Sequence, residues 1–514
     1  MMLSDISEGY FDFRALDRMG VRISNLVTDS RAVKPGDTFL AYAGERDDGR
    51  QFIPQALAAG ANAVLWESHG FVWDPAWKTP NLPIGGLRNL AGVIADHVFG
   101  HPSKKLWLIG ITGTNGKTSC SHWIAQAMDA LGTKTAVIGT IGTGFLGQLE
   151  STANTTPDSV LLQRKMADFL AQGARCVAME VSSHGIVQER LNGSTFALAL
   201  FTNLSRDHLD YHGNMETYAA AKARLFRWPG LKYAVVNVDD AFGAKLAQQL
   251  EDTPTQIIGY GFSEPGERNC ESEKFRLLRG LNLRTDLRGL VFDIEFGADH
   301  AEFSTGLIGS FNALNLLGVL AVLLASGTAL ENAVRAMQEA RPVAGRMQRI
   351  GGGEQPLVVV DYAHTPDAME KVLTTLREVL DASAGTETET TRKPRLICVF
   401  GCGGERDRGK RALMGEVATR LSDDVVITSD NPRREDPNAI IRQITSGTAG
   451  NFRVERDRTR AISAAIRGAQ KGDIVLIAGK GHEAYQEIDG QKLPFTDTEV
   501  ARQVLMDGCV TEQT

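Results

Sequence analysis

Short apolar runs alternate with polar or glycine-rich loops and with longer helical segments along most of the chain. In the first hundred residues, two such runs, Asp37–Gly44 and Ala61–Glu67, are broken by turns and indicate a small α/β unit. The segment Gly100–Lys105 is punctuated by Gly, Pro and Ser, which predicts a linker. We therefore expect the first domain to span residues 1–102.

A second unit opens with the apolar run Leu106–Thr112, which has the pattern of a buried strand. The unit extends to about residue 343, where the sequence RPVAG separates a long helical stretch from the next strand. Within it, the near-apolar run Leu316–Leu330 is too short to span a membrane, so we interpret it as a buried helix. The expected second domain spans residues 103–343.

The third unit repeats one pattern four times: an apolar run, a polar or glycine-rich loop, and a helical segment. The four stretches are Pro356–Asp367, Pro394–Asp407, Asp423–Asp436 and Gly472–Glu483. Strands that alternate with helices predict a parallel sheet, here in a Rossmann-like, doubly wound domain over residues 344–514. The polar segment 381–393 predicts a mobile surface loop.

Ligands of such a sheet collect beyond the carboxyl ends of its strands, where the four loops lie. We expect nine polar or charged side chains to gather along this rim: Asp361, His364, Glu405, Arg406, Asp430, Asn431, Arg433, His482 and Glu483. Each of them alone also suits a turn or a helix cap.

Composition and charge narrow the class of protein. At about 150 residues per domain, a length of 514 agrees with three domains, and 43% apolar residues exclude disorder as the global state. The 55 basic and 62 acidic residues give a net charge of −7, which argues against nucleic acid or an anionic membrane as the main partner. The first thirteen residues lack the Lys or Arg of a secretory signal. We expect a cytoplasmic monomer without stable membrane insertion.

The segment Leu106–Ser119 places a predicted strand before a glycine-rich loop, and a helical segment follows it. Backbone N–H groups and a helix N-terminus cradle phosphate oxygens in that context. Lys117 would then reach the outer phosphates, and the Thr118 hydroxyl would bind magnesium. Five residues separate Gly110 from Gly116 where the usual phosphate loop has four, so the sequence TGTNGKT is a variant of that loop.

Two further segments suggest metal ligands. Glu180 follows the predicted strand Cys176–Met179 and would complete a magnesium site beside the phosphate loop, although a salt bridge or a helix cap explains an isolated Glu equally well. After the apolar run Phe196–Leu204 come Asp207, His208, Asp210 and His212. Their chemistry alone leaves a second magnesium site and a set of surface residues both open.

Taken together, these segments resemble the Mur ligases, the ATP-dependent amide-forming enzymes of peptidoglycan precursor synthesis. The resemblance covers nearly the whole chain and is carried, in order, by TGTNGKTS, NTTPD, EVSSHG, TNLSRDHLDYHG, GSFNALN, GRMQ, DYAHTPD, GCGGERD, DNPR and GKGHE. Folylpolyglutamate synthetases share the ATP module but would not be expected to carry the VTDSR segment or the DNPR loop in this form.

Within the family, the motifs are most similar to those of ligases that add meso-diaminopimelate to UDP-N-acetylmuramoyl-L-alanyl-D-glutamate. The resemblance implies an ADP-forming acid–amino-acid ligase with ATP and Mg²⁺, an acyl-phosphate intermediate, and a small UDP-binding first domain before the ATPase domain. It leaves open a lysine-adding ligase. A phosphate-loop switch protein would leave the charged rim of the third domain unexplained, and the presence of Lys117, Glu180 and Lys222 weakens the case for an inactive scaffold.

The resemblance also implies roles for individual residues around ATP. The expected ATP contacts are Gly113, Thr114, Asn115, Gly116, Lys117, Thr118, Ser119, Asn312, Asn315, Arg346 and Asp361. The expected catalytic residues are Lys117, Glu180, His208 and Lys222. Thr118 and Glu180 would hold one magnesium ion, and His208 would hold a second with Lys222 carbamylated, because a carbamate turns an ammonium into an anionic oxygen ligand. Without the resemblance, Lys222 is a solvated helix lysine.

Two more sets of residues follow from the resemblance. The UDP-linked peptide would contact Thr28, Ser30, Glu45, Arg46, Asp47, Asn154, Thr155, Thr156, Ser182, Gln188 and Arg190. Diaminopimelate would contact Arg406, Asp430, Asn431, Pro432, Arg433, Gly479 and Glu483. Arg433 and Arg406 suit the carboxylate that distinguishes diaminopimelate from lysine, and the acids Asp430 and Glu483 suit its distal ammonium.

Overall fold

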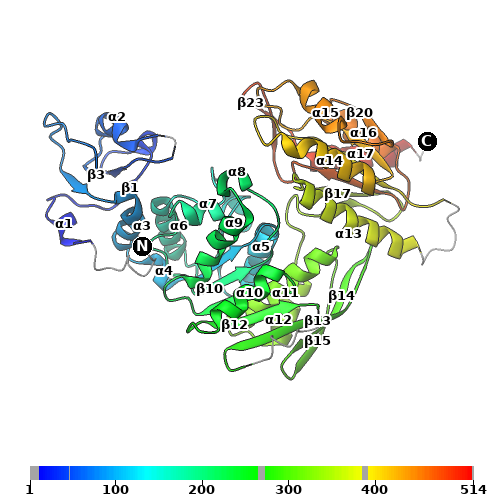
Figure 1. The fold of residues 1–514 in the computed structure, drawn as a ribbon, viewed down its shortest axis with the longest axis horizontal. Coiled ribbons are helices and arrows are strands. Elements are labelled where there is room, and N and C mark those ends of the chain that lie inside the picture. The colour runs from blue at the N-terminus through cyan, green and yellow to red at the C-terminus, as the bar shows by residue number, and fades with distance from the viewer. Residues whose placement is uncertain (1–10, 46, 264–271, 385–391, 512–514) are drawn as a thin grey trace.

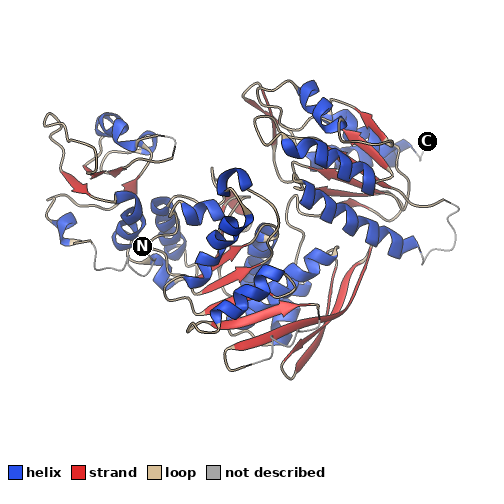
Figure 2. Ribbon diagram, in the orientation of Figure 1, coloured by secondary structure: helices blue, strands red, loops and turns tan. Residues whose placement is uncertain are grey.

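The structure is a computed structural model, and it describes residues 11–45, 47–263, 272–384 and 392–511. Three α/β domains follow one another, with the N-terminal and C-terminal domains on either side of the central one (Figure 1). Each domain packs helices against a sheet (Figure 2). Among the described residues, no helix is long and apolar enough to cross a membrane. Within the predicted loop 381–393, residues 385–391 lie outside the described part.

The N-terminal domain contains a four-stranded parallel sheet in the order β1-β2-β3-β4. Its elements are α1 Arg14–Asp17, β1 Leu26–Val27, β2 Thr38–Ala41, α2 Ile53–Ala58, β3 Ala63–Glu67, β4 Asn81–Ile84 and α3 Leu87–Val98. The two predicted apolar runs form β2 and β3, which confirms their interpretation as part of an α/β unit. The predicted linker contains a short helix, α4 (Pro102–Lys105), because Pro102 occupies its first turn and His101 before it adopts a left-handed φ of 57°.

The central domain holds an eleven-stranded sheet in the order β15-β14-β13-β12-β11-β10-β5-β9-β6-β7-β8. Its strands are β5 Trp107–Thr112, β6 Thr135–Ile138, β7 Thr143–Phe145, β8 Gln148–Glu150, β9 Cys176–Glu180, β10 Leu198–Phe201, β11 Tyr233–Asn237, β12 Gln256–Gly261, β13 Phe275–Asp286, β14 Gly289–Phe296 and β15 Asp299–Thr305. The pairs from β13 through β6 are all parallel, which confirms the expected mostly parallel sheet. The strand β5 lies between β9 and β10, so the loops after these three strands meet at one edge.

Helices cover both faces of the central sheet, which is why its inner strands are continuously apolar (Figure 2). One face packs against α5 (Lys117–Ala130), α11 (Ser310–Ala325) and α12 (Leu330–Gln338), and the other against α6 (Ser159–Ala171) and α10 (Ala241–Leu250). The shorter helices are α7 Ser183–Val187, α8 Leu209–His212 and α9 Met215–Ala223.

The apolar run Leu316–Leu330 is buried over most of its length, as predicted, but it is not one helix, and Gly327 and Ala329 between its two helices are exposed. The helix α11 ends at Ala325, and the chain turns at Gly327, whose φ of 88° favours glycine. The next helix, α12, begins at Leu330.

The C-terminal domain has a six-stranded sheet in the order β16-β17-β21-β18-β19-β20, parallel except for β16. Its strands are β16 Gln348–Gly351, β17 Leu357–Asp361, β18 Leu396–Phe400, β19 Asp424–Ile427, β20 Phe452–Val454 and β21 Ile474–Ala478. The four predicted apolar runs form β17, β18, β19 and β21 and lie next to one another, as expected. The hairpin of β22 (Tyr485–Ile488) and β23 (Gln491–Pro494) was not predicted.

Helices also cover both faces of this sheet, which confirms the doubly wound arrangement. One face carries α13 (Pro366–Ala384), α14 (Gly409–Leu421) and α15 (Pro437–Thr445). The other carries α16 (Arg458–Arg467) and α17 (Asp497–Thr511). Because β18 and β21 are neighbours with helices on opposite faces, the loops after these strands diverge at the position where such sheets bind ligands.

Candidate active site

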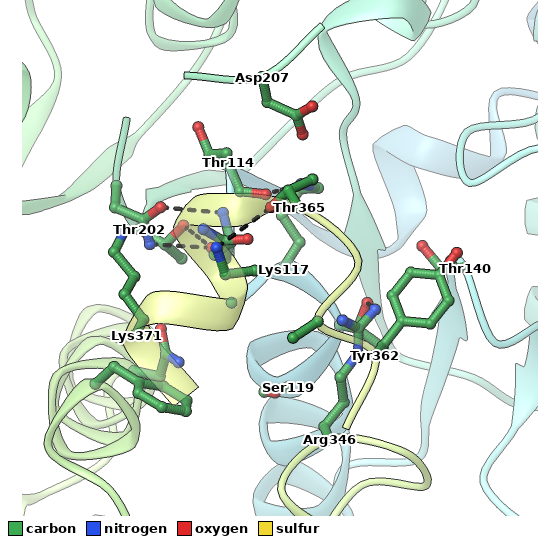
Figure 3. A pocket seen from close by; sticks show the side chains of 18 of the residues that line it. Thr114, Lys117, Ser119, Thr140, Thr202, Asp207, Arg346, Tyr362, Thr365 and Lys371 are labelled. Carbon is green, nitrogen blue, oxygen red and sulfur yellow. Dashed lines mark hydrogen bonds between the residues drawn. The ribbon is translucent and has the colours of Figure 1, made fainter. Parts of the chain in front are cut away.

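A cavity of about 390 Å³ lies between the central and C-terminal domains, at the carboxyl edge of the central sheet (Figure 3). The central domain lines it with the loop between β5 and α5, with the ends of β9 and β10, and with side chains of α9 and α11. The C-terminal domain contributes the segment after residue 345, the end of β17 and the start of α13. The cavity therefore joins the predicted ATP contacts of two domains.

Two glycines fix the loop between β5 and α5. A Cβ atom on Gly113 would lie 1.9 Å from Thr202 Oγ1, and one on Gly116 would lie 2.4 Å from Asn315 Oδ1. The φ angle of Gly116 is also +86°, which L side chains rarely adopt. A side chain at either position would force its neighbour to move, and the second approach places the predicted Asn315 against the phosphate loop.

The loop after β10 braces the phosphate loop through hydrogen bonds that the sequence did not predict. The Asn115 N–H donates to Asn203 Oδ1 at 3.0 Å, and Thr202 Oγ1 donates to the Asn115 carbonyl at 2.6 Å. The available signal was the position of Thr202 and Asn203 directly after a buried strand. That signal becomes specific only once β10 is known to lie beside β5.

Two lysines converge on one carbonyl of the phosphate loop. Lys117 Nζ donates to the carbonyls of Gly113 at 2.8 Å and Thr114 at 2.9 Å, and Lys222 Nζ donates to Gly113 at 2.8 Å. Lys222 is 1% exposed and lies 4.3 Å from the centre of the Tyr218 ring. The interpretation of Lys222 as a solvated helix lysine is therefore wrong, because α9 turns this side chain inward.

The surroundings of Lys222 favour its neutral amine. Burial, reinforced by repulsion from Lys117, lowers the pKa of Lys222 well below its usual value, and Asp207 opposes the shift. Burial also lowers the pKa of Lys117. A neutral amine is the form that can react with carbon dioxide, so the position suits carbamylation.

Glu180 lies at the end of β9, next to Ile111 of β5. It is fully buried and accepts hydrogen bonds from Thr118 Oγ1 at 3.0 Å and from both the main-chain N–H (2.8 Å) and the hydroxyl (3.0 Å) of Thr140. The structure brings the predicted magnesium ligands Thr118 and Glu180 together. Sequence reasoning missed Thr140.

The four polar residues after β10 do not form one cluster. Asp207 and His208 line the cavity, with His208 Nε2 lying 3.4 Å from Asp207 Oδ2. Asp210 is exposed, and His212 is buried with Nε2 at 2.9 Å from Ser183 Oγ. Among the described residues, no group of three or more His, Cys, Asp or Glu side chains is placed to hold a metal.

The remaining predicted ATP contacts lie on opposite walls of the cavity. Asn312 and Asn315 are both buried on α11. Arg346 Nη2 donates to Thr118 Oγ1 at 3.1 Å, so it reaches the central domain from the C-terminal one, and its guanidinium lies 4.6 Å from the centre of the Tyr362 ring (Figure 3). Asp361 accepts the main-chain N–H groups of residues 347 and 363, each at 2.8 Å, and burial raises its pKa.

Part of the predicted UDP-peptide set forms a connected network beside the cavity. Thr156 is buried and bonds to Ser182 Oγ at 3.0 Å, while Arg190 Nη1 donates to the Thr156 carbonyl at 2.7 Å. Thr155 and Ser182 line the cavity. Asn154 is exposed. The NTTPD and EVSSHG segments, which are distant in sequence, are thus joined by side-chain hydrogen bonds.

Glu45 connects the N-terminal domain to this network. Its carboxylate accepts hydrogen bonds from Gln188 Nε2 at 2.7 Å and from the Tyr211 hydroxyl at 3.1 Å. The predicted contacts Glu45 and Gln188 therefore meet across a domain boundary. Asp47 is exposed.

The other predicted residues of the N-terminal domain lie further along its loops. Thr28 Oγ1 donates to Asp158 Oδ1 at 3.5 Å. Ser30 is buried and donates to Gln55 Oε1 at 2.9 Å. Arg46 lies outside the described residues.

Side chains from the loops after β19 and β21 meet at the rim of the C-terminal sheet. Asn431 Nδ2 donates to Glu483 Oε2 at 2.7 Å, and Lys480 Nζ donates to Asn431 Oδ1 and Glu483 Oε2, both at 3.0 Å. Asp430 is buried, and a Cβ on Gly479 would lie 2.8 Å from its Oδ2. Sequence analysis missed the fully buried Lys480, although it stands in the GKGHE motif.

The predicted arginines lie on neighbouring loops of the same rim. Arg433 adopts a left-handed φ of 52°, donates from Nη1 to the Gly404 carbonyl at 2.6 Å, and has Nε 3.3 Å from Glu487 Oε2. Pro432 is buried, whereas Arg406 is exposed. The predicted rim of nine residues is therefore divided. Asp361 and His364, from the loop after β17, line the nucleotide cavity, whereas none of the described lining residues comes from the loops after β18, β19 and β21.

Comparison with known proteins agrees with this architecture. Residues 22–98 match the model described as "Mur ligase family, catalytic domain", residues 111–323 match "Mur ligase middle domain", and residues 345–481 match "Mur ligase, glutamate ligase domain". The three matches fall on the three sheets in the same order.

Similar proteins cover almost the entire chain. A UDP-N-acetylmuramoyl-L-alanyl-D-glutamate–2,6-diaminopimelate ligase from Nitrosomonas europaea is 55% identical over 96% of this chain and 95% of its own. The ligase of the same name from Chromobacterium violaceum is 51% identical over 96% and 97%. A solved structure of a ligase with this name is 36% identical, covers 95% of both chains and has a TM-score of 0.67. The chain therefore belongs to the Mur ligase family.

Proposed function

We propose that this protein is an ATP-dependent, ADP-forming ligase that joins meso-diaminopimelate to the D-glutamyl γ-carboxylate of UDP-N-acetylmuramoyl-L-alanyl-D-glutamate, in peptidoglycan precursor synthesis. The relatives named for this activity support the substrates. A cytoplasmic location, a monomeric state and the domain bounds 1–102, 103–343 and 344–514 stay our proposals.

The observation that carries the proposal is the shared cavity. The phosphate loop, with Lys117 and Thr118, forms its central-domain wall, and Arg346 reaches Thr118 from the opposite domain at 3.1 Å. A ligase that makes a reactive acyl phosphate needs a site that two domains can close, because water would otherwise hydrolyse the intermediate. A switch protein that only hydrolyses a nucleotide has no need of the charged rim on the C-terminal domain.

The chemistry begins with activation of a poor electrophile. An oxygen of the γ-carboxylate attacks the γ-phosphorus of ATP, the bond to the ADP oxygen breaks, and an acyl phosphate forms. Lys117 and the first N–H groups of α5 would bind the phosphate oxygens, where charge stabilisation supplies most of the catalysis. Arg346 would add a second cation from the C-terminal side.

The donor atoms at Thr118 and Glu180 fit Mg²⁺, which prefers oxygen ligands and completes its shell with phosphate oxygens. The two side-chain oxygens are buried and 3.0 Å apart beside the phosphate loop. When bound, the ion would neutralise charge on the phosphates. Arg346 already contacts the same hydroxyl, which ties this position to the domain contact.

The second predicted metal position fits only if Lys222 is modified. An ammonium cannot bind a cation, and His208 alone is a weak site for Mg²⁺. Addition of carbon dioxide to the neutral Lys222 amine forms an N–C bond and releases one proton, which leaves an anionic carbamate beside the cavity. We propose this modification, supported by the burial of Lys222 and the lowered pKa of its amine.

In the second half of the reaction, the amine of meso-diaminopimelate attacks the acyl carbon, and the tetrahedral intermediate expels phosphate as the nitrogen loses a proton. Arg433 and Arg406 would bind the carboxylate that lysine lacks, and Glu483 would face the distal ammonium. Lysine has no second carboxylate to pair with these arginines, so its complex would lack that charge-assisted contact.

The test is phosphate release with the UDP-linked dipeptide and ATP, with meso-diaminopimelate or L-lysine supplied separately, in the parent protein and in Arg433→Ala. We expect turnover with meso-diaminopimelate only, and loss of about 2–5 kcal/mol of its transition-state stabilisation in the variant. Equal turnover of both amines by the parent would contradict the substrate. Phosphate release that needs neither amine nor dipeptide would contradict the ligase.

A further inference from the structure

A buried arginine connects the two loops of the C-terminal rim that carry Arg406 and Arg433. Arg411, near the start of α14, is fully buried, and its guanidinium donates to both carboxylate oxygens of Glu435, at 3.0 and 3.2 Å. It also donates to the Gly403 carbonyl at 2.9 Å. Arg411 therefore contacts the loop after β18 and the loop after β19 with one planar group.

Glu435 completes the connection from the other side. Its Oε1 accepts the main-chain N–H of Glu405 at 2.5 Å, one residue before Arg406. Hydrogen bonding from Arg411, followed by that from the Glu405 N–H, lowers the pKa of Glu435 to about 2. Its carboxylate is therefore ionised at neutral pH. We call Arg411 and Glu435 the loop clasp.

Main-chain contacts show how closely the clasp holds the two loops. A Cβ on Gly404 would lie only 2.0 Å from the Pro432 carbonyl oxygen. Arg433 Nη1 donates back to the Gly404 carbonyl at 2.6 Å. Arg406 directly follows Glu405, whose main-chain N–H binds Glu435, and Arg433 stands two residues before Glu435 itself. Both arginines expected to bind a carboxylate therefore lie next to the clasp in sequence.

Stability alone is a weak reason for such a pair, because the desolvation of the buried Arg411 guanidinium offsets much of its attraction to the Glu435 carboxylate, whose side chain is 16% exposed. Geometry is a stronger reason. Two-point recognition of a carboxylate requires guanidinium groups held within about 0.5 Å of the productive position. Long side chains on independent loops would lose that precision, and a misplacement near 1 Å can reduce a rate by about 10²-fold.

We propose that the loop clasp is a positioning device that sets selectivity for an amino acid bearing a second carboxylate. The inference rests on the proposed function and adds two residues to it. Neither Arg411 nor Glu435 contacts the substrate in this account. They act by fixing the spacing between the loops of Arg406 and Arg433.

The decisive variant is Glu435→Gln in the full-length protein, because two explanations predict opposite results. If Glu435 acted only through its charge, its removal would strengthen the positive field and lower the KM for meso-diaminopimelate. Loss of positioning instead raises that KM by about 10-fold or more, and lowers selectivity over L-lysine by a similar factor. The KM values for ATP and for the UDP-linked dipeptide should stay within about twofold of the parent.

Asp473→Asn is the control for loss of an ion pair between one buried and one less buried partner elsewhere in the same domain. Asp473 is fully buried in the same domain. Its Oδ1 lies 2.6 Å from Arg392 Nη2, and its Oδ2 lies 3.3 Å from Arg395 Nη2. It directly precedes β21, so it stands at the opposite edge of the sheet from the rim. We expect Asp473→Asn to lower the unfolding midpoint without changing the KM for meso-diaminopimelate.

Arg411→Lys provides a second variant if Glu435→Gln does not fold. It keeps the charge but cannot hold both Glu435 oxygens and the Gly403 carbonyl, so we expect an intermediate rise in the same KM. An unchanged or lower KM in the folded variants, or an equal rise in Asp473→Asn, would overturn the inference. The proposed function fails separately, if the parent itself does not prefer meso-diaminopimelate.

Discussion

The nucleotide cavity and the amino-acid rim hold their functional groups by different means. At the cavity, close approaches at Gly113 and Gly116 fix the loop before Lys117, with side chains supporting it from outside. At the rim, the loops are joined by ion pairs, the partly exposed pair of Arg411 with Glu435 and the fully buried pair of Arg458 with Asp497. The cavity is shaped by glycines that leave no room for a side chain, whereas the rim is held together by ion pairs.

The difference teaches what each site can tolerate. Phosphate is bound by main-chain N–H groups, which every residue except proline carries, so the cavity depends on backbone shape more than on side-chain identity. A particular amino acid is recognised by side chains, which must be positioned by other side chains. Changes at the cavity should therefore affect every substrate combination, and changes at the rim should affect one substrate.

The largest expected effect comes from the cation at the cavity. Lys117→Ala removes the ammonium that would face the phosphate oxygens, and we expect kcat with meso-diaminopimelate to fall by about 10³-fold. Steady-state phosphate release measures this change. Lys165→Ala, at an exposed ion pair with Glu150, is the control and should keep its activity. An unchanged kcat with only the KM for meso-diaminopimelate raised would contradict the comparison.

The next largest effect tests a buried ion pair of the rim. Arg458 donates to both Asp497 oxygens, at 2.7 and 2.8 Å, and to main-chain carbonyls at the ends of β19 and β21. Asp497→Asn leaves this guanidinium without its counter-charge and should destabilise the C-terminal domain by about 3–5 kcal/mol.

The measurement for Asp497→Asn can separate the domains. All six tryptophans, the last at Trp228, precede the C-terminal domain. Unfolding followed by circular dichroism should therefore gain an early transition that tryptophan fluorescence does not report. If the unfolding midpoints from circular dichroism and from tryptophan fluorescence fell together, the Arg458–Asp497 pair would stabilise the whole chain and not only the C-terminal domain.

A smaller effect should follow from a single methyl group at the cavity. Gly116→Ala places a Cβ against Asn315 in a backbone conformation that disfavours it, so we expect the KM for ATP to rise by about 10-fold. Gly132→Ala shares the positive φ, here 79°, but no atom lies within 4 Å of the added Cβ. It should lose about 1 kcal/mol of stability and no ATP affinity. Equal KM values for ATP in Gly116→Ala and Gly132→Ala would show that the contact with Asn315 does not matter for ATP binding.

The smallest expected effect is a dependence on pH. The pKa of Glu435 is lowered to about 2 in the folded protein, against a usual value of 4.5, so its ionised form contributes stability above the unfolded pKa. This contribution is complete at pH 7, begins to fall near pH 4.5 and is lost as the pH approaches the folded pKa. The free energies of unfolding of the parent and of Glu435→Gln, measured by urea titration, should therefore converge as the pH falls through that range. A constant difference would contradict the assignment.

The sequence predicted the elements that apolar runs define. The strands β2, β3, β5 and β9, with β17, β18, β19 and β21 of the C-terminal sheet, appear where the runs place them, because burial on both faces requires continuous apolar sequence. The run that became α11 and α12 was divided by the turn at Gly327, since apolar content shows burial but not where a helix ends.

The supporting side chains of both sites were largely unpredictable. Thr202 and Thr140 are ordinary loop residues until strand order places them beside the phosphate loop and Glu180. The inward orientation of Lys222 depends on how α9 packs, which no local spacing reveals. Arg411 and Glu435 meet only after two βα units fold together. Contacts between segments distant in sequence are set by topology.

The most direct test of the central claim follows an oxygen atom through the reaction. The UDP-linked dipeptide is prepared with oxygen-18 in both oxygens of its D-glutamyl γ-carboxylate and turned over with ATP and meso-diaminopimelate. An acyl phosphate formed in the shared cavity predicts that each phosphate released carries one labelled oxygen. Phosphate without the label, released at the same rate as the product, would contradict the account.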